Sequence, residues 1–310
     1  ILFTIIGAEM KTLTIFTPAY NRGYIINQCF ESLCRQTCKD FIWLVVDDGS
    51  TDNTAGLIKT WQQQENGFEI KYIYKKNGGM HTAHNVAYEN IDTELNVCID
   101  SDDYMPDDAV EKIISFWQKN GCDEYAGIIA LDIYKGSSNV IGTELPNKKS
   151  TTLMGYYKNG GSGDKKLIYR TDVIKATPAY PEFEGEKYVG LAYKYHIIDE
   201  TKELLIMNEP VCIVDYQEDG SSFSMWKQYF NNPKGFAFLR VVDMERQSGL
   251  DLFKTCVHYV SSSIIAKEHE FIKKSPKKLQ TILAIPFGVA LSMLIKYKVK
   301  QNSSFKMKAK

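Results

Sequence analysis

The sequence predicts an α/β protein in which a mostly parallel sheet is flanked by helices, with a helical extension at the C-terminal end. Three observations lead to this prediction. Strand-like runs alternate with helical periodicity along residues 13–134. The run Phe41–Val46 is continuously apolar, as expected of a strand buried on both faces. The chain has 310 residues, 44% of them apolar, which is enough for a large core and excludes a disordered chain.

The elements of the first half follow one another at the spacing of strand–helix units. We expect strands at residues 13–17, 41–46, 70–74, 95–99 and 125–134. We expect helices over residues 25–36, 51–64, 82–90 and 106–119, with Asp52 and Asp107 as helix caps. Such an order is typical of a parallel sheet with helices on both faces.

The second half is less regular. Residues 136–163 are rich in Gly, Ser and Lys and are expected to contain loops. Strands are predicted at residues 167–169 and 204–216, and helices at residues 226–247 and 250–273. We therefore expect two domains, an α/β domain over residues 10–220 and a helical extension over residues 221–310.

Polar residues cluster where three predicted strands end, at residues 21–22, 47–48 and 100–103. In parallel sheets, ligands bind at the carboxyl ends of the strands. The third cluster holds Asp100, Asp102 and Asp103, and adjacent carboxylates repel each other unless a cation lies between them. We therefore expect a cation to be held at this cluster.

Charge is unevenly distributed along the chain. Residues 271–310 contain ten Lys and no Asp or Glu, whereas residues 1–270 contain 27 basic and 38 acidic residues. An acidic body argues against nucleic acid as a partner. Residues 281–295 are uncharged and lie between lysines. They are too short for a comfortable membrane span, so we expect a membrane-surface segment, with a buried C-terminal helix as the alternative.

Seven cysteines without a C-x-x-C pair indicate reduced thiols and a cytoplasmic protein, placed by its tail on the inner face of the cell membrane. Residues 1–9 lack the features of a signal peptide. Met10 precedes the first strand, and we expect residues 1–9 to lie outside the native protein.

Four motifs together resemble the inverting family 2 glycosyltransferases and their GT-A fold. They are Thr17-Pro-Ala-Tyr-Asn-Arg22, Asp47-Asp-Gly-Ser-Thr-Asp52, Asn77-Gly-Gly with Asn85, and Asp100-Ser-Asp102. The resemblance covers residues 11–120 and implies transfer of a sugar from a nucleotide donor, UDP-linked by expectation, to a glycan or lipid-linked saccharide acceptor. It implies that residues 10–220 form the nucleotide-sugar-binding and catalytic domain, and that Asp102 and Asp100 hold a divalent metal, Mn²⁺ or Mg²⁺. It implies that the following residues contact the nucleotide sugar: Thr17, Pro18, Ala19, Tyr20, Arg22, Asp47, Asp48, Asn77, Gly78, Gly79, Asn85, Asp100 and Ser101.

The resemblance also implies a carboxylate that acts as general base on the acceptor hydroxyl. The Glu-Asp pair of the family is absent, and Glu184-Gly-Glu186-Lys187 occupies the corresponding region. We match Glu186 to the base and keep Glu184 as the second candidate, with solvated surface glutamates as the alternative. A loop at Tyr216–Ser222 resembles one that closes over the donor.

Two other functions remain open. A sugar-phosphate nucleotidyltransferase would share the fold, but the first strand lacks the Gly-rich basic loop of that class. The second open function is a non-catalytic glycan- or membrane-binding module with a degenerate donor site. The intact Asp100-Ser-Asp102 argues against it and the missing Glu-Asp pair argues for it.

Overall fold

The computed structural model describes residues 11–217 and 225–308. The expectations for residues 1–9, for a domain boundary at 220/221 and for most of the loop at residues 216–222 lie outside these residues. The chain forms two compact units. The first contains the segments up to Asn77, Ala83–Ala179 and Lys194–Tyr216, and the second contains Gly78–Thr82, Tyr180–Tyr193 and the chain from Gln217 onward.

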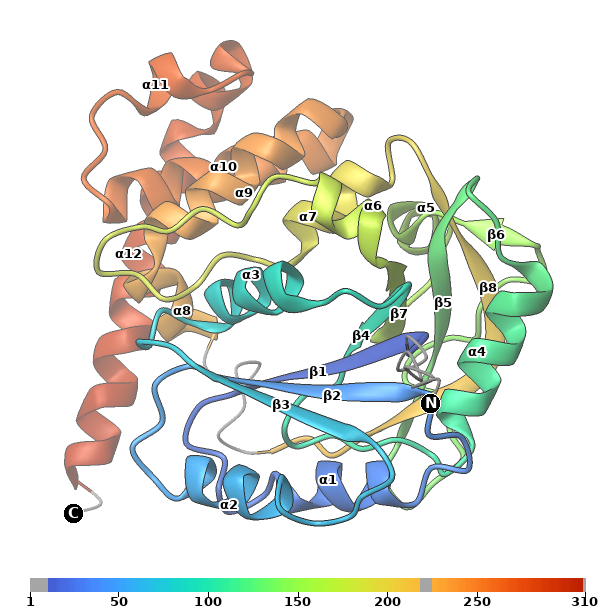
Figure 1. The fold of residues 1–310 in the computed structure, drawn as a ribbon. Helices are drawn as coiled ribbons and strands as arrows, with labels where there is room; N and C mark the ends of the chain where they lie inside the picture. Colours follow the sequence, from blue (N-terminus) through green and yellow to red (C-terminus); the bar gives the residue numbers. More distant parts are fainter. Residues whose placement is uncertain (1–10, 218–224, 309–310) are drawn as a thin grey trace, which may run out of the picture. The chain divides into compact units, whose positions relative to one another are not determined.

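The first unit is built on a mixed eight-stranded sheet with the order β3-β2-β1-β4-β7-β5-β8-β6 (Figure 1). The strands are β1 (Leu13–Ala19), β2 (Phe41–Asp47), β3 (Glu69–Tyr74), β4 (Leu95–Cys98), β5 (Tyr125–Tyr134), β6 (Ser150–Thr151), β7 (Lys165–Arg170) and β8 (Glu203–Val214). Strands β1 to β4 are mutually parallel, whereas β7 runs antiparallel to both of its neighbours, β4 and β5. The prediction of a mostly parallel sheet flanked by helices is confirmed.

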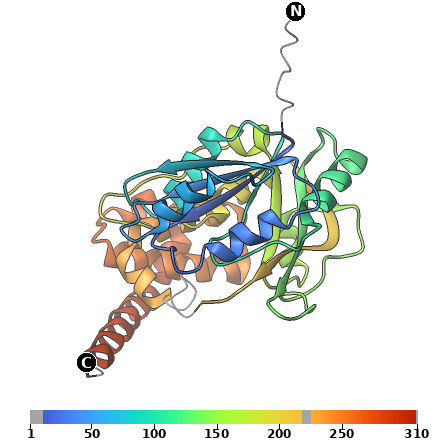
Figure 2. The ribbon, with the colours of Figure 1, turned by 60° about the horizontal axis from the view of Figure 1, so that its bottom comes forward.

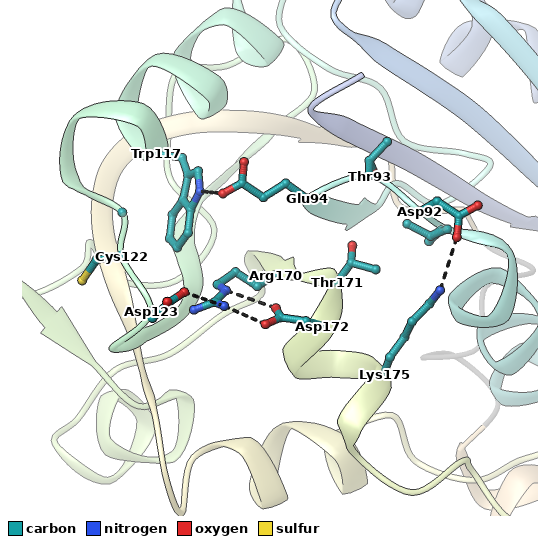
Figure 3. Close-up of a pocket in the computed structure, with 12 residues that line it drawn as sticks. Asp92, Thr93, Glu94, Trp117, Cys122, Asp123, Arg170, Thr171, Asp172 and Lys175 are labelled. Carbon is teal, nitrogen blue, oxygen red and sulfur yellow. Dashed lines mark hydrogen bonds and ion pairs between the residues drawn. The ribbon is translucent and has the colours of Figure 1, made fainter. Parts of the chain in front are cut away.

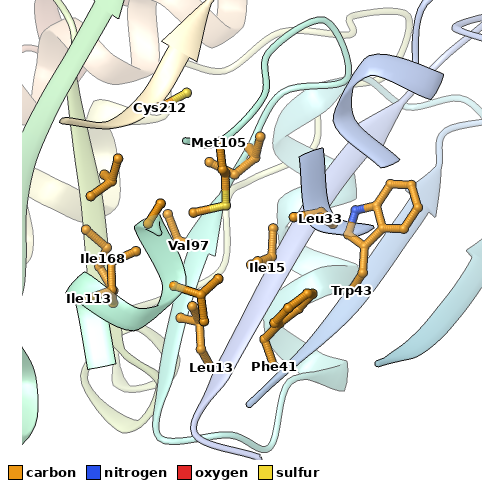
Figure 4. Close-up of a cluster of buried hydrophobic side chains, with 14 of the residues drawn as sticks. Leu13, Ile15, Leu33, Phe41, Trp43, Val97, Met105, Ile113, Ile168 and Cys212 are labelled. Atoms are coloured by element: carbon orange, nitrogen blue, oxygen red, sulfur yellow. The ribbon is translucent and has the colours of Figure 1, made fainter. Parts of the chain in front are cut away.

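Helices cover both faces of the sheet. They are α1 (Asn27–Cys34), α2 (Thr54–Trp61), α3 (Met80–Asn90) and α4 (Ala109–Asn120). Leu13 and Ile15 of β1 face α1 and share a buried core with Leu33, Trp43 and Ile113 (Figure 4). Phe16 points to the opposite face, where its ring meets those of His84 and Tyr88 on α3. This alternation is the period-two pattern of a strand buried on both sides.

Residues 136–163, expected to contain loops, also contain β6 and helix α5 (Leu153–Lys158), which were not predicted. Thr152 caps α5 by accepting the N–H of Gly155. A threonine at this position is a helix-start signal that we did not recognise within the Gly-rich segment. Two short helices were not predicted, α6 (Thr171–Ala176) and α7 (Ala192–Ile198). Asp52 accepts the N–H of Thr54, the first residue of α2, but the N-cap position itself is Asn53. The cap predicted at Asp107 is wrong by one residue, because Asp108 is at the N-cap of α4 and Asp107 pairs with Arg35.

The second unit is largely helical. It contains α8 (Met225–Asn231), α9 (Pro233–Arg246), α10 (Gly249–Ile265), α11 (Phe271–Lys274) and α12 (Lys278–Lys308). The helix predicted at residues 226–247 is divided at Asn232, because Pro233 starts α9 at its first position. A small core lies between α9, α10 and α12 and includes Met244, Cys256, Val260 and Ala284. Helix α12 runs through Pro286 without ending, and its C-terminal end extends beyond α10 (Figure 2).

Candidate active site

The polar clusters of the first unit meet at one edge of the sheet. Strand β1 pairs with β2 on one side and with β4 on the other, both parallel. Ala19 at the end of β1 lies opposite Asp47, and the chain after β4 continues the pairing through the N–H of Ile99 and the carbonyl of Phe16. The three chain segments that follow β1, β2 and β4 therefore leave the sheet side by side, which is where such sheets bind ligands.

The turn after β2 is fixed by its own carboxylates. Asp47 is fully buried, and its oxygens accept the N–H of Ser50 at 2.7 Å and the hydroxyl of Tyr72 at 2.7 Å. Burial and this hydrogen bond raise the pKa of Tyr72. Asp48 pairs with Lys75 at 2.6 Å and accepts the side-chain amide of Asn77. Both aspartates predicted to bind the nucleotide are thus rigidly oriented at the sheet edge.

The turn after β2 packs closely against the chain segment after β3 through Gly49 and Asn77. Gly49 has φ +83°, and a Cβ there would lie 2.7 Å from the backbone nitrogen of Asn77. Asn77 also donates its side-chain amide to the carbonyl of Asp48 at 2.7 Å. The close approach requires glycine and joins two of the predicted nucleotide-binding motifs.

In the motif Thr17–Arg22, the first three side chains are buried and only the later ones reach the surface of the first unit. Thr17, Pro18 and Ala19 are buried in β1, and the Thr17 hydroxyl accepts the indole N–H of Trp43 at 3.0 Å. Tyr20 is exposed at 48%. The Arg22 guanidinium lies over the Tyr24 ring. Only the last residues of this motif therefore present side chains at the surface of the first unit.

The predicted metal-binding turn follows β4 directly. Asp100 and Asp102 are half-buried, and Ser101 is buried. Their carboxylate oxygens are the hard ligands that Mg²⁺ and Mn²⁺ prefer, so the donor set fits such an ion. Within the described residues, no three His, Cys, Asp or Glu side chains are grouped so as to hold a metal by themselves. An ion at this turn would therefore need oxygen ligands from a second source, such as a diphosphate.

A buried charge cluster lies behind this turn. Lys166 of β7 is 3.8 Å from Asp132 of β5, and the two side chains are 11% and 3% exposed. Burial raises the pKa of Asp132 to about 6 and that of Asp103 to about 7, while Lys166 lowers both. Asp103 also accepts the N–H of Asp215 at 3.2 Å. Lys166 therefore supplies the positive charge next to two buried carboxylates, those of Asp132 and Asp103. Asp103 directly follows the predicted metal-binding turn.

Sequence reasoning missed Lys166 and Asp132. A signal was present, because both are charged residues in or beside runs predicted as strands of a buried sheet. Charged residues are almost never buried unless they are paired. A Lys and an Asp inside such strands indicate a buried ion pair.

The predicted catalytic segment belongs to the second unit. Glu186 accepts the N–H groups of Lys234 and Gly235, each at 2.9 Å, so its carboxylate caps the start of α9. Glu184 is exposed. Gly79 has φ +96°, and a Cβ there would lie 2.0 Å from the carbonyl oxygen of Lys187. The predicted donor segment at Gly78 and Gly79 thus lies directly against the predicted base segment within this unit, while Asn85 is half-buried on α3 of the first unit.

A pocket of about 520 Å³ opens elsewhere on the first unit, at the start of β4 (Figure 3). Arg170 crosses it and pairs with Asp123 at 2.8 Å and with Asp172 at 2.6 Å. Trp117 donates its indole N–H to Glu94. The pocket contains none of the residues predicted for nucleotide or metal binding, and its charged groups pair with one another.

Comparison with known proteins agrees with this arrangement. Part of the chain is similar to curated bacterial proteins, among them chondroitin synthase of Escherichia coli, which is 33% identical over 112 residues, or 36% of this chain and 16% of that protein. The chain spans only 14% to 38% of the length of three other curated relatives that it matches.

Two solved structures share the fold. S. aureus TarS 1–349 in complex with UDP-GlcNAc matches with a TM-score of 0.62 and 17% identity, over 94% of this chain and 92% of that one. The mannosyltransferase PcManGT of Pyrobaculum calidifontis, in complex with GDP-Man and Mn²⁺, matches with a TM-score of 0.51 and 14% identity, over 96% and 81%. The sequence model described as "Glycosyl transferase family 2" matches residues 14–177, which is just over half of the chain. The chain therefore belongs to glycosyl transferase family 2.

Proposed function

We propose that the protein is a metal-dependent, inverting glycosyltransferase. It transfers a sugar from a nucleotide donor, in our proposal a UDP-sugar, to a glycan or lipid-linked saccharide acceptor in cell-surface polysaccharide synthesis. The observation that carries this proposal is the placement of the Asp47-Asp48 and Asp100–Asp102 carboxylates after β2 and β4, which flank β1. The UDP-GlcNAc complex of TarS and the relationship to chondroitin synthase support the choice of donor and product.

In this proposal the fixed turn after β2 binds the nucleotide. Asp47 offers carboxylate oxygens to the N–H of a uracil, and its present hydrogen bonds keep it oriented. Asp102 and Asp100 hold Mn²⁺ or Mg²⁺. Such an ion, when bound, neutralises the charge that develops on the leaving diphosphate.

Glu186 is the proposed general base. A carboxylate oxygen would accept the proton of the acceptor hydroxyl, and the two N–H groups at the start of α9 fix the position of the Glu186 carboxylate. Each carboxylate oxygen has a second lone pair, so capping of α9 and proton acceptance are compatible. Glu184, which is exposed, remains the second candidate.

The membrane surface is the proposed location, on the cytoplasmic side, with residues 271–310 as the contact. Helix α12 supports this, because residues 278–301 contain an 18-residue window with a mean hydropathy of 1.7 and are long and apolar enough to cross a membrane by length and composition. A lipid-linked acceptor would then meet the enzyme at the same surface.

Thermal unfolding with nucleotides tests the donor site. A ligand at about 100 times its Kd stabilises the native state by about 2.7 kcal/mol, which for a chain of this size raises Tm by roughly 5 °C. We expect this rise with UDP or a UDP-sugar and Mn²⁺, and its loss with EDTA.

The variant Asp102→Ala should lose the metal-dependent rise, whereas Asp251→Ala, which removes an exposed carboxylate on α10, should keep it. A rise of equal size in Asp102→Ala would refute the metal assignment. The absence of any rise with any nucleotide would favour the non-catalytic module instead.

A further inference from the structure

Helix α12 has two faces of different character. The face toward α10 is buried, and it contains Thr281, Ala284, Gly288, Ser292 and Ile295. The opposite face is apolar and exposed, with Leu279, Ile282, Leu283, Phe287, Met293, Leu294 and Tyr297 between 43% and 67% accessible. We call these seven residues the outer face of α12. An uncovered apolar surface of this kind marks a contact with another molecule or with lipid.

Helical geometry shows that the outer face is one continuous stripe. At about 100° of rotation per residue, its seven residues fall within an arc of roughly 140°, and the buried residues lie on the opposite side. Lys278 and Lys296 lie beyond one border of the stripe and Lys298 lies beyond the other. An apolar stripe bordered by lysines is the pattern of a helix that lies in a membrane interface.

We propose that α12 lies in the plane of an anionic membrane surface, with its outer face in the lipid and its inner face still packed on α10. The inference deepens the proposed membrane location, on which it rests, by specifying the face and the lipid charge. The lysines at both ends of the stripe would reach the phosphate groups of anionic lipids.

The packing on α10 argues against a helix that crosses the bilayer. A Cβ at Gly288 would lie 2.5 Å from the side chain of Val260, so the two helices are in close contact at this point. Val260, Cys256 and Ala284 share one core. A spanning α12 would have to leave this core and would expose the buried hydroxyls of Thr281 and Ser292 to hydrocarbon.

A second copy of the chain is a poorer occupant of the same face. Two α12 helices packed through their outer faces would bring lysines at 278, 296, 298 and 300 of both copies together, in either direction of packing. Residues 271–310 contain no Asp or Glu that could neutralise them. Anionic headgroups provide that neutralisation, so lipid fits the charge and a second copy does not.

Vesicle sedimentation of the full-length protein tests the proposal without any sugar donor. We expect binding to vesicles of phosphatidylcholine with phosphatidylglycerol, weaker binding to phosphatidylcholine alone, and weakening by salt. Leu283→Glu and Phe287→Glu should each lower the partition coefficient at least about tenfold. Leu250→Glu, which adds the same charge at a leucine 78% exposed at the start of α10, is the matched control and should bind like the wild type.

Each contrary result has a definite meaning. No binding of the wild type to anionic vesicles, or equal binding by Leu283→Glu and Leu250→Glu, overturns the proposal. A wild-type dimer in solution that Leu283→Glu converts to a monomer shows that the occupant is a second copy. Retention in cell membranes after alkaline carbonate extraction shows a spanning helix. Because the donor assay reads Tm with UDP, failure of the membrane contact and failure of the glycosyltransferase proposal are distinguishable.

Discussion

Replacement of Lys166 by methionine should destabilise the protein strongly and in a pH-dependent way. Methionine has a similar length, so the change removes chiefly the positive charge 3.8 Å from Asp132. Asp132 is 3% exposed by its side chain, and one of its oxygens has no hydrogen-bond partner among the described residues. An unpaired buried carboxylate costs about 3–5 kcal/mol. We therefore expect Lys166→Met to lower the free energy of unfolding by this amount at pH 8.

The pH dependence follows from the pKa of Asp132. Burial raises this pKa from its ordinary 3.8 to about 6 even with Lys166 present. The folded protein therefore holds the proton more tightly than the unfolded chain, and stability falls as pH rises between these two values. Loss of Lys166 raises the pKa further, and each additional unit widens the gap to the wild type at pH 8 by about 1.4 kcal/mol. At pH 5, where Asp132 is protonated, the gap should be smaller.

Urea unfolding at pH 5 and pH 8, followed by tryptophan fluorescence, measures both effects. With a urea m-value of about 3 kcal/mol/M, the midpoint at pH 8 should fall by about 1 M or more. Lys148→Met, at an exposed lysine, is the control and should change stability by less than about 0.5 kcal/mol. A variant as stable as the wild type at pH 8, or a gap of equal size at both pH values, would refute the role assigned to Lys166.

Two further substitutions test the second unit. Glu186→Gln leaves one carbonyl oxygen and places an amide donor against the N–H groups of α9, so we expect a loss of about 1–2 kcal/mol in stability and at least about 100-fold in sugar transfer; Glu184→Gln should change stability little. Gly79→Ala places a Cβ against the Lys187 carbonyl in addition to the strain at φ +96°, and should lower Tm more than Gly185→Ala, where φ is +79° and the space is open.

The outcomes of these substitutions separate structure from catalysis. A Glu186→Gln protein with lowered Tm but wild-type transfer would show that the carboxylate only caps α9, and loss of transfer in Glu184→Gln would assign the base to that residue. Equal destabilisation by the two glycine variants would contradict the close approach of Gly79 to Lys187.

The parts of the fold that depend on local pattern were predictable. Phe41–Val46 was predicted as a strand because its apolar run is continuous, and the observed strand is one residue longer. Pro233 explains a helix start that the periodicity of residues 226–247 did not reveal. The position of β7 was not predictable, because the sequence of Lys165–Arg170 contains no signal that this strand pairs antiparallel with β4 on one side and β5 on the other. Its pairing with β4 joins residues 71 to 75 apart in the sequence, and its pairing with β5 joins residues 34 to 42 apart.

The candidate site was likewise predictable only where it depends on local sequence pattern. The aspartates that follow β2 and β4 could be placed at one sheet edge from strand order alone. The capping of α9 by Glu186 could not, because it depends on a helix that begins 47 residues later. Lys166 next to Asp132 likewise requires the sheet order. Contacts of this kind arise only when the tertiary structure forms.

The insertion of β7 has a consequence for folding during synthesis. Strand β4 ends at Cys98, but the strand that covers its outer edge begins only at Lys165. While the intervening residues are being made, the hydrogen-bonding groups along that edge of β4 are unpaired, and such an edge is prone to pair with other chains. A fragment that stops near residue 120, although it contains the best-matched motifs, would keep this edge open permanently. We expect it to aggregate rather than fold.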